Sequence, residues 1–307
     1  MSIPIDRTNR LAGPLQSESA GAMPTPIMRR YLTRYASRAL APTGGFLSGF
    51  AFSLNPYVGC PFGAAGGCPF CYVRALPVAR TEPGGWGEWV IAKANLPELL
   101  ERELHTLARN GKLADAAIFM SSATDPYQGW ERRLGLTRRI LEVIASNPPR
   151  RLLLQTRSPM VERDIDLIQL LGQRAIVSMT LETDDDNVRR AMTPTSPSVA
   201  RRIATMARLR AAGIFTQMAI APMMPNDPDH FAAIADTVAD RVIVDTYFDG
   251  DGASGRRSRS LGMGELYARL GYSEWFRPGA ETALLAAMRS RLGNDRVLFS
   301  RSGFNTV

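Results

Sequence analysis

The sequence predicts an α/β protein built around a parallel β-sheet, and three observations support this fold class. First, 45% of the 307 residues are hydrophobic, which is enough for one large α/β domain or two small ones. Second, six short apolar runs recur along the chain after residue 45. Third, an amphipathic stretch of helical length separates each run from the next, which is typical of right-handed βαβ units.

The six apolar runs are the predicted strands, because each is short and apolar and is bounded by turn residues or by an amphipathic stretch. They span residues 50–54, 117–121, 151–155, 175–181, 215–221 and 241–246. A doubly wound open sheet and a full or partial (β/α) barrel both fit this alternation. In either fold, chemistry belongs at the carboxyl ends of the strands.

The five amphipathic stretches are the predicted helices, at residues 96–110, 130–145, 161–171, 197–212 and 228–239. Two of them have recognisable start signals. Asn95 followed by Glu98 resembles a capping box, and Ser196 before Pro197 places a cap next to a first-turn proline.

The chain divides into three parts. Residues 1–45 are rich in Pro, Gly, Ser and Ala, and we expect an extension that lies on the core, with one short helix at 28–35. Residues 46–250 form the core, and residues 251–307 complete or cover it. The segment 249–260 is rich in Gly, Ser and Arg; it is either a mobile lid or disordered, and its composition favours disorder.

Charge and hydropathy limit the partners and the cellular location that the sequence predicts. The net charge of +8 permits attraction to nucleic acid, but much of the excess is arginine on predicted helix faces, so this indication is weak. No apolar run approaches the roughly 18 residues that span a bilayer, and the first residues lack a secretory signal. We therefore expect a cytoplasmic protein without a membrane partner.

The three cysteines, Cys60, Cys68 and Cys71, are the strongest functional signal. They fall within twelve residues, directly after the first predicted strand, and an odd number so crowded argues against a disulfide framework. Three thiolates on this Gly-rich loop could hold three corners of a [4Fe-4S] cluster and leave the fourth iron open. Gly63, Gly66 and Gly67 would let the backbone curl around such a cluster.

The cysteine loop and several other segments resemble a known family. A strand, a cysteine loop and a CxxC with aromatic Phe70 before its last cysteine resemble the signature of radical S-adenosylmethionine (SAM) enzymes. The spore photoproduct lyase-like branch, with its uncharacterised bacterial members, is similar in further segments: Asn55-Pro56-Tyr57, Ser122 to Tyr127, Arg163-Asp164, Arg190 through Pro194 to Arg202, and Ile220-Ala221-Pro222. The usual spacing is CxxxCxxC, whereas seven residues separate Cys60 from Cys68 here.

The resemblance implies a partial (β/α)6 TIM-type barrel and an enzyme that uses a [4Fe-4S] cluster to cleave SAM. The resulting 5′-deoxyadenosyl radical would abstract hydrogen from an unknown substrate, with electrons from an external donor. It also implies residues that bind SAM: Phe70, Ser121, Ser122, Thr124, Ser178, Thr180, Glu182, Arg190 and Ala221, with Arg157 as a further candidate for its carboxylate. Glu182, at the end of the fourth predicted strand, would hold the ribose hydroxyls.

Two alternatives remain open. The cysteines could hold a structural zinc with His105 or His230 in a nucleic-acid-binding protein whose arginine-rich loop contacts phosphate. The chain could also keep the cluster without the radical chemistry. The resemblance adds one constraint: spore photoproduct lyases typically use a further cysteine as hydrogen donor, and this sequence has none, which argues against lesion repair by that route.

Overall fold

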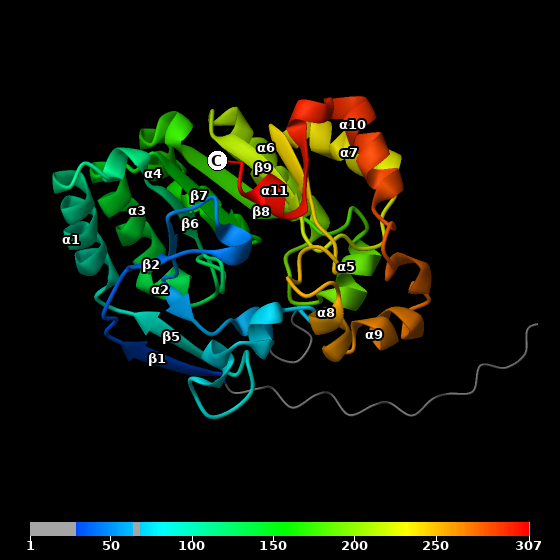
Figure 1. Cartoon of the computed structure of the whole chain (residues 1–307), viewed down its shortest axis with the longest axis horizontal. Helices are drawn as coiled ribbons and strands as arrows, with labels where there is room; N and C mark the ends of the chain where they lie inside the picture. The colour runs from blue at the N-terminus through cyan, green and yellow to red at the C-terminus, as the bar shows by residue number, and fades with distance from the viewer. Residues whose placement is uncertain (1–28, 64–67, 307) are drawn as a thin grey trace, which may run out of the picture.

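The computed structural model describes residues 29–63 and 68–306 and shows an α/β fold with one large sheet. The order of the strands in this sheet is β11-β10-β9-β8-β7-β6-β3-β2, and all neighbours are parallel except β2 and β3. The sheet curves without closing, which is a partial barrel (Figure 1). Its strands are β2 (Leu40–Pro42), β3 (Phe52–Leu54), β6 (Ala117–Met120), β7 (Arg151–Thr156), β8 (Ala175–Thr180), β9 (Phe215–Ile220), β10 (Arg241–Val244) and β11 (Val297–Phe299).

The six predicted strands are confirmed as β3 and β6 to β10. β2 and β11 extend the sheet at its two edges and come from segments outside residues 46–250. A separate three-stranded sheet, ordered β1-β5-β4, lies beside the N-terminal edge. It consists of β1 (Arg30–Arg34), β4 (Tyr57–Val58) and β5 (Trp89–Lys93). The predicted helix at 28–35 is therefore wrong: from Arg30 to Arg34 the backbone pairs with β5 as a strand.

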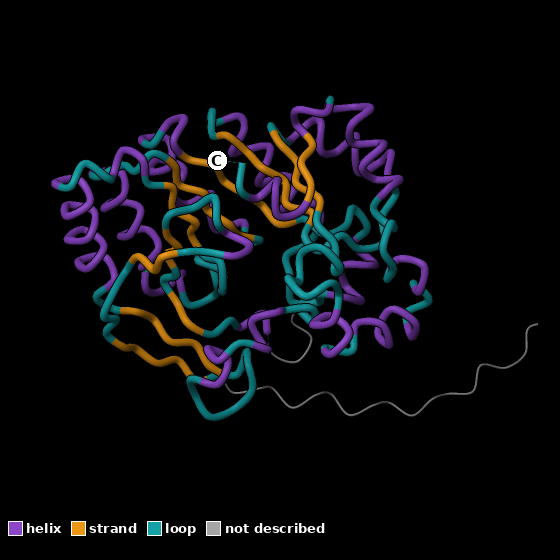
Figure 2. The backbone as a smooth tube through the Cα atoms, viewed as in Figure 1, coloured by secondary structure: helices purple, strands orange, loops and turns teal. Residues whose placement is uncertain are grey.

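The helices that follow the strands of the large sheet lie on its outer side, whereas the C-terminal helix packs on the inner face (Figures 1 and 2). All five predicted helices exist. Gly135, at φ +58°, divides the second into a short and a longer helix, and the first half of the third is the 3-10 helix Pro159–Asp164. The α-helices are α1 (Leu96–Arg109), α2 (Glu131–Leu134), α3 (Leu136–Ser146), α4 (Ile165–Leu170), α5 (Asp186–Met192), α6 (Val199–Ala211), α7 (Pro228–Val238), α8 (Arg256–Ser260), α9 (Met263–Arg269), α10 (Thr282–Leu292) and α11 (Ser300–Phe304). Within the described residues, no helix is long and apolar enough to cross a membrane.

Both predicted start signals are wrong in detail. The side chain of Asn95 does not cap α1; it exchanges two hydrogen bonds with the backbone of Ala36, which fixes the N-terminal segment to the core. Ser198, not Ser196, caps α6 by accepting a hydrogen bond from the backbone N–H of Arg201.

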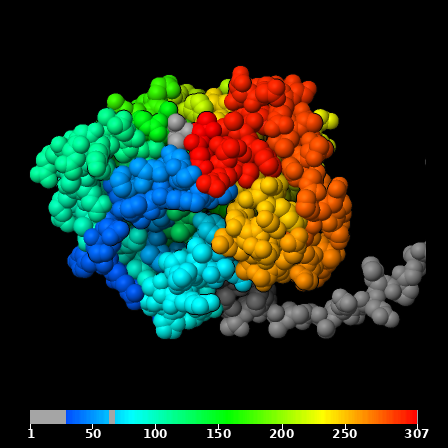
Figure 3. Space-filling view, viewed as in Figure 1, coloured from blue at the N-terminus to red at the C-terminus, as the bar shows by residue number. Residues whose placement is uncertain are grey.

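Alternation along the strands gives the sheet two different faces. The outer face packs against the helices and forms the main apolar core. The inner face carries a smaller apolar cluster, which includes Phe50 before β3 and Phe304 of α11. The C-terminal α11 and residues 45–50 meet there, where the backbone N–H of Gly49 bonds to Asn305 at 2.5 Å; Figure 3 shows the red and blue ends of the chain in contact. Nearer the carboxyl ends the inner face is polar.

The segment 249–260 is structured, which contradicts the expectation of disorder. The carboxylate of buried Asp251 accepts hydrogen bonds from the backbone N–H groups of Ala253, Gly255 and Ser258, and α8 follows directly. The carboxylate of Asp251 thus gives a regular structure to a segment whose composition predicted disorder. Of the glycines predicted to curl around the cluster, Gly66 and Gly67 lie outside the described residues.

Candidate active site

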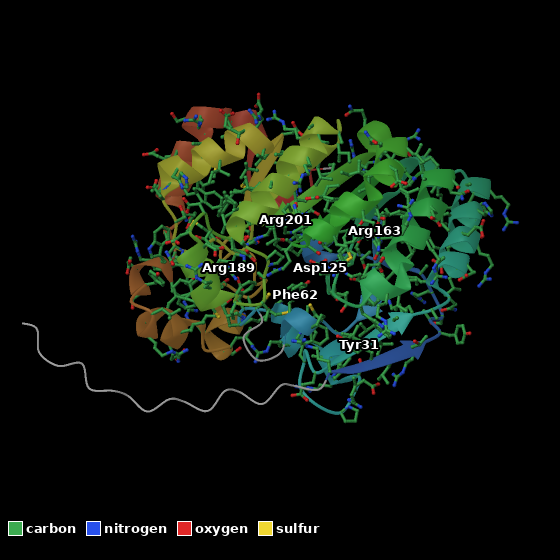
Figure 4. The ribbon with its side chains drawn as sticks, turned by 180° about the vertical axis from the view of Figure 1, so that it is seen from behind. Tyr31, Phe62, Asp125, Arg163, Arg189 and Arg201 are labelled. Carbon is green, nitrogen blue, oxygen red and sulfur yellow. The ribbon has the colours of Figure 1, made fainter. Side chains whose placement is uncertain are left out.

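A cavity of about 480 Å³ opens at the carboxyl ends of the parallel strands, where the fold class places chemistry. Cys60, Cys68 and Cys71 line one side of it, next to β3. The loops after β6, β7, β9 and β10 line much of the rest, together with residues of the segment before β3, of α8 and of α11. In Figure 4 Asp125, which belongs to the loop after β6, lies near the middle of the molecule close to Phe62 of the cysteine loop. The predicted ligands therefore face a space of the size of a nucleoside-like ligand.

The chemistry of the three thiols suits a metal centre. All three cysteines are free of disulfide bonds, and Cys68 is buried. Burial raises the pKa of Cys60 and of Cys68 to about 12, so neither would ionise alone near neutral pH. Thiols bind metals as thiolates, and coordination supplies the positive charge that burial withholds. Three such groups around one cavity fit an iron-sulfur cluster with an open iron.

The histidines offered for a zinc site are elsewhere. His105 is exposed on α1, and His230 is exposed at the start of α7 with its Nδ1 2.6 Å from Asp184 Oδ2. Asp184 and His230 line a different cavity of about 490 Å³, which contains no cysteine. Within the parts of the chain that the structure covers, no three His, Cys, Asp or Glu side chains come close enough to hold a single ion. This arrangement does not support the Cys3His interpretation.

The loop after β6 is fastened to the cysteine loop by hydrogen bonds. Thr124 Oγ1 donates to the carbonyl of Gly59 at 2.9 Å, and Tyr72 Oη donates to the carbonyl of Ser122 at 2.6 Å. Asn55 joins both segments, since Nδ2 donates to Ser122 Oγ at 3.2 Å and Oδ1 accepts from the backbone N–H of Ala123 at 3.0 Å. The segments Asn55 to Tyr57 and Ser122 to Tyr127 therefore act together to position the cysteines.

Gly59 is where this positioning depends most on the backbone. Its φ is +83°, and a Cβ there would lie 2.3 Å from the carbonyl oxygen of Trp89. Gly59→Ala is expected to destabilise the protein by about 1 to 3 kcal/mol and to lower the iron bound after reconstitution. Gly111→Ala is the matched control, because Gly111 has φ +66° with nothing within 4 Å of the added Cβ. Equal iron content and unfolding midpoints in the two variants would contradict this reasoning.

Arg157 is the charged group closest to the cysteines. Its Nη1 lies 2.9 Å from the Sγ of Cys68 and 3.1 Å from Oε1 of Glu182, while its backbone N–H donates to Asp125 Oδ2 at 2.8 Å. A guanidinium in this place stabilises negative charge on the sulfur. In the structure Arg157 contacts Cys68 and Glu182, whereas the sequence analysis suggested it for the SAM carboxylate.

Six of the nine side chains predicted to bind SAM line the cavity: Phe70, Ser121, Ser122, Thr124, Thr180 and Ala221. Ser121 is notable among them. It is buried with φ +73°, a conformation rare for a residue with a side chain, and its Oγ has no hydrogen-bond partner. Strain of this kind gathers at binding sites, and an orphaned buried hydroxyl facing a cavity suits a polar ligand atom.

Ser178 and Glu182 lie behind the cavity wall. Ser178 is fully buried and accepts a hydrogen bond from Gln217 Nε2 at 2.8 Å. Glu182 is also fully buried; its Oε2 pairs with Arg202 Nη1 at 2.7 Å, and its Oε1 forms an ion pair with Arg157 without hydrogen-bond alignment. These two ion pairs engage the carboxylate of Glu182, which the family resemblance implied would bind the ribose hydroxyls.

Arg190 lies apart from the cavity, on the exposed face of α5. Its side chain is 60% exposed and pairs with Asp186 at 2.8 Å. Its neighbour Arg189 turns inward and donates to the carbonyl oxygens of Pro194 and Ser196 at 3.1 Å, as its place in Figure 4 also indicates. The Arg190-to-Arg202 segment thus contributes to structure through Arg189 and Arg202.

Tyr57 and Arg163, from two of the segments that resemble the family, meet in a largely buried network. Glu131 is its centre: it accepts hydrogen bonds from Tyr57 Oη, from Arg163 Nη2 at 2.6 Å and from the backbone N–H of Thr137 at 2.9 Å. Arg163 is labelled in Figure 4. This network stabilises the base of the site and does not line the cavity.

Sequence reasoning missed Gln155 and Asp245, which also line the cavity. Gln155 donates from Nε2 to Thr180 Oγ1 at 2.6 Å and leaves its buried Oε1 without a partner. Asp245 directly follows β10. A search for polar residues at the carboxyl end of every predicted strand would have found both.

Comparison with protein families gives one match over more than half of the chain. The sequence profile of the Radical SAM superfamily matches residues 54–238. An uncharacterised protein of Methanocaldococcus jannaschii is 31% identical over 62% of this chain and 66% of its own length. One of Mycobacterium tuberculosis H37Rv is 28% identical over 59% of this chain and 52% of its own. The chain thus matches less than two thirds of the length of each of these relatives.

Solved structures share the fold at low sequence identity. A spore photoproduct lyase variant superposes with a TM-score of 0.61 at 11% identity and covers 88% of this chain and 81% of that one. A spore photoproduct lyase complexed with dinucleoside spore photoproduct gives a TM-score of 0.60 at 12% identity with the same coverage. At such identities the likeness concerns the fold alone.

Proposed function

The chain belongs to the radical SAM superfamily of enzymes, and from this premise we propose that Cys60, Cys68 and Cys71 hold a [4Fe-4S] cluster that cleaves SAM reductively. The observation that carries the proposal is the convergence of all three thiols on one cavity at the carboxyl ends of the parallel strands. When bound, the cluster and SAM supply an electron and a 5′-deoxyadenosyl radical that abstracts hydrogen from a substrate. An external donor supplies the electron.

The protein itself would hold the cluster, orient SAM and shield the radical from solvent. Cys60, Cys68 and Cys71 would hold the cluster through their thiolates, and the family resemblance implies that SAM would bind at the iron without a protein ligand. Arg157, whose Nη1 lies 2.9 Å from Cys68 Sγ, stabilises the charge on that ligand. The cavity walls exclude bulk water from the reacting groups, which protects a radical from quenching.

We propose three SAM contacts among the residues that line the cavity. The hydroxyl of Ser121, which has no partner, accepts or donates a hydrogen bond to a polar group of SAM. Thr180, at the end of β8, offers a hydroxyl on the same inner face. Phe70 and Ala221 provide apolar surface for adenine. Ser122 and Thr124 act indirectly, since their hydrogen bonds hold the cysteine loop.

The decisive test is the formation of 5′-deoxyadenosine. The full chain, purified without oxygen and reconstituted with iron and sulfide, is expected to be brown, and to release 5′-deoxyadenosine from SAM when dithionite is added. The same sample without dithionite is the control and is expected to release none. Colourless protein that binds zinc in place of iron would contradict the proposal, and a brown protein that never cleaves SAM would limit it to cluster binding.

A further inference from the structure

The carboxyl end of β10 carries a buried acid that neither the cysteines nor the proposed SAM contacts use. Asp245 is 6% exposed and lines the cavity. Its inward direction follows from alternation: Ile243, two residues earlier, belongs to the inner-face cluster. Four strands separate β10 from β3 in the sheet, but the sheet curves, and the loop after β10 meets the cysteine loop where the rings of Tyr247 and Phe70 lie 6.2 Å apart.

The surroundings of Asp245 hold its carboxyl group in one place. Oδ1 accepts a hydrogen bond from the backbone N–H of Thr246 at 2.9 Å, and the hydroxyl of Ser300 lies within reach. Oδ2 of Asp245 lies so close to Gly250 that a Cβ at position 250 would be 2.0 Å from it, so only glycine fits at that position. Ser300 itself has φ +46°, a strained conformation for serine. A strand end, a strained serine and an obligatory glycine therefore converge on one carboxyl group.

No basic side chain balances this acid. Among residues 29–63 and 68–306 no basic side chain forms an ion pair with Asp245, and the charges that act on it most are the negative charges of Asp249 and Asp251. The two arginines that line the cavity are engaged elsewhere. Arg157 pairs with Glu182, and Arg257 donates from Nη1 to the carbonyl oxygen of Asp251 at 2.8 Å. A buried carboxylate without a counter-ion is costly, and a cationic ligand would remove that cost.

We propose that Asp245 binds the substrate through a protonated amino group, which makes the substrate of this enzyme a basic amine. The inference rests on the proposed function, because it takes the cavity to be the place where the substrate reacts. A carboxylate held by a backbone N–H and a hydroxyl keeps free acceptor positions for an ammonium group. Asp245 is thus a specificity residue in the cavity that the three cysteines also line.

Binding through Asp245 depends on pH in a defined direction. Burial, with the nearby charges of Asp249 and Asp251, raises the pKa of Asp245 to about 7. Tyr247 on the same loop and Arg257 on α8 also line the cavity, and Arg257 is held by the carbonyl oxygen of Asp251. Ala221, which follows β9, and Ser300 on α11 carry no charge. Since the carboxylate is about one tenth ionised at pH 6 and about nine tenths at pH 8, amine affinity is expected to rise about tenfold over that interval.

The test uses the full chain reconstituted without oxygen and two probes, benzylamine and benzyl alcohol, which differ only in the group that would meet Asp245. Saturation-transfer NMR at pH 8 is expected to give a dissociation constant about tenfold lower for benzylamine. Asp245→Asn, and independently Gly250→Ala, which displaces the carboxyl, are expected to abolish this preference. Asp295→Asn is the control: Asp295 is exposed before β11, does not line the cavity and should leave the preference intact.

Equal binding of the two probes, or an unchanged preference in Asp245→Asn, would overturn the proposal. Displacement of benzylamine by S-adenosylhomocysteine would assign Asp245 to SAM and would overturn it as well, whereas simultaneous binding supports a separate substrate site. The measurement needs neither SAM nor reductant. A failure to form 5′-deoxyadenosine, which would contradict the proposed function, is therefore distinguishable from a failure of this inference.

Discussion

Cys71→Ala is expected to reduce the iron bound after reconstitution from about four per chain to background and to abolish 5′-deoxyadenosine formation. Cys71 lies on the same cavity as Cys60 and Cys68, and these are the only three cysteines in the sequence. No other thiol can replace the lost ligand. The brown colour and the visible absorbance should disappear together with the iron, because two thiolates do not hold the cluster.

The histidines provide the matched controls for this experiment. His105→Ala and His230→Ala remove the two side chains that a Cys3His zinc site would require, and both are exposed away from the cavity. Both variants are expected to retain the iron content and the 5′-deoxyadenosine yield of the parent chain. Iron content that survives in Cys71→Ala, or that falls in either histidine variant, would sink the ligand assignment.

The part of the fold that local pattern determines could be predicted from the sequence. Strands β3 and β6 to β10 are short apolar runs, and the helices between them carry an apolar stripe, so periodicity identifies both. The cysteine loop could also be located from the sequence, because its three cysteines lie close together and follow a strand. Six of the predicted SAM residues line the cavity for the same reason, since they fall at or near strand ends.

The parts that depend on distant contacts could not be predicted. β1 is mostly exposed and becomes a strand only because β5, almost sixty residues later, pairs with it. The segment 249–260 acquires structure from the carboxylate of Asp251, which composition does not reveal. Glu182 follows a strand end, as a binding residue would. Its ion-pair partners Arg157 and Arg202 lie on other elements, and with them the Glu182 side chain is buried in the core and does not line the cavity.

Glu182→Gln is expected to cost about 3 to 5 kcal/mol of unfolding free energy, because it leaves buried Arg202 and Arg157 without their counter-ion. Arg202 is fully buried, and its Nη1 also donates to the carbonyl oxygen of Thr180 at 2.8 Å, so it cannot reach water without disturbing β8. The measurement is denaturant unfolding at pH 7 of the chain without its cluster. Glu142→Gln is the control, since Glu142 forms an exposed pair with Arg138 at 3.7 Å and surface pairs contribute little.

The pH dependence separates a structural Glu182 from one that binds ribose. Burial acts to raise the pKa of Glu182, but the guanidinium groups of Arg157 and Arg202 hold it below the usual 4.5. Its stabilising contribution is therefore present above about pH 4.5 and is lost as the pH falls through the lower folded pKa. The difference in unfolding free energy between the parent chain and Glu182→Gln should narrow below that pH. If Glu182→Gln unfolds like the parent chain but binds SAM more weakly, Glu182 binds the ribose and this structural role is contradicted.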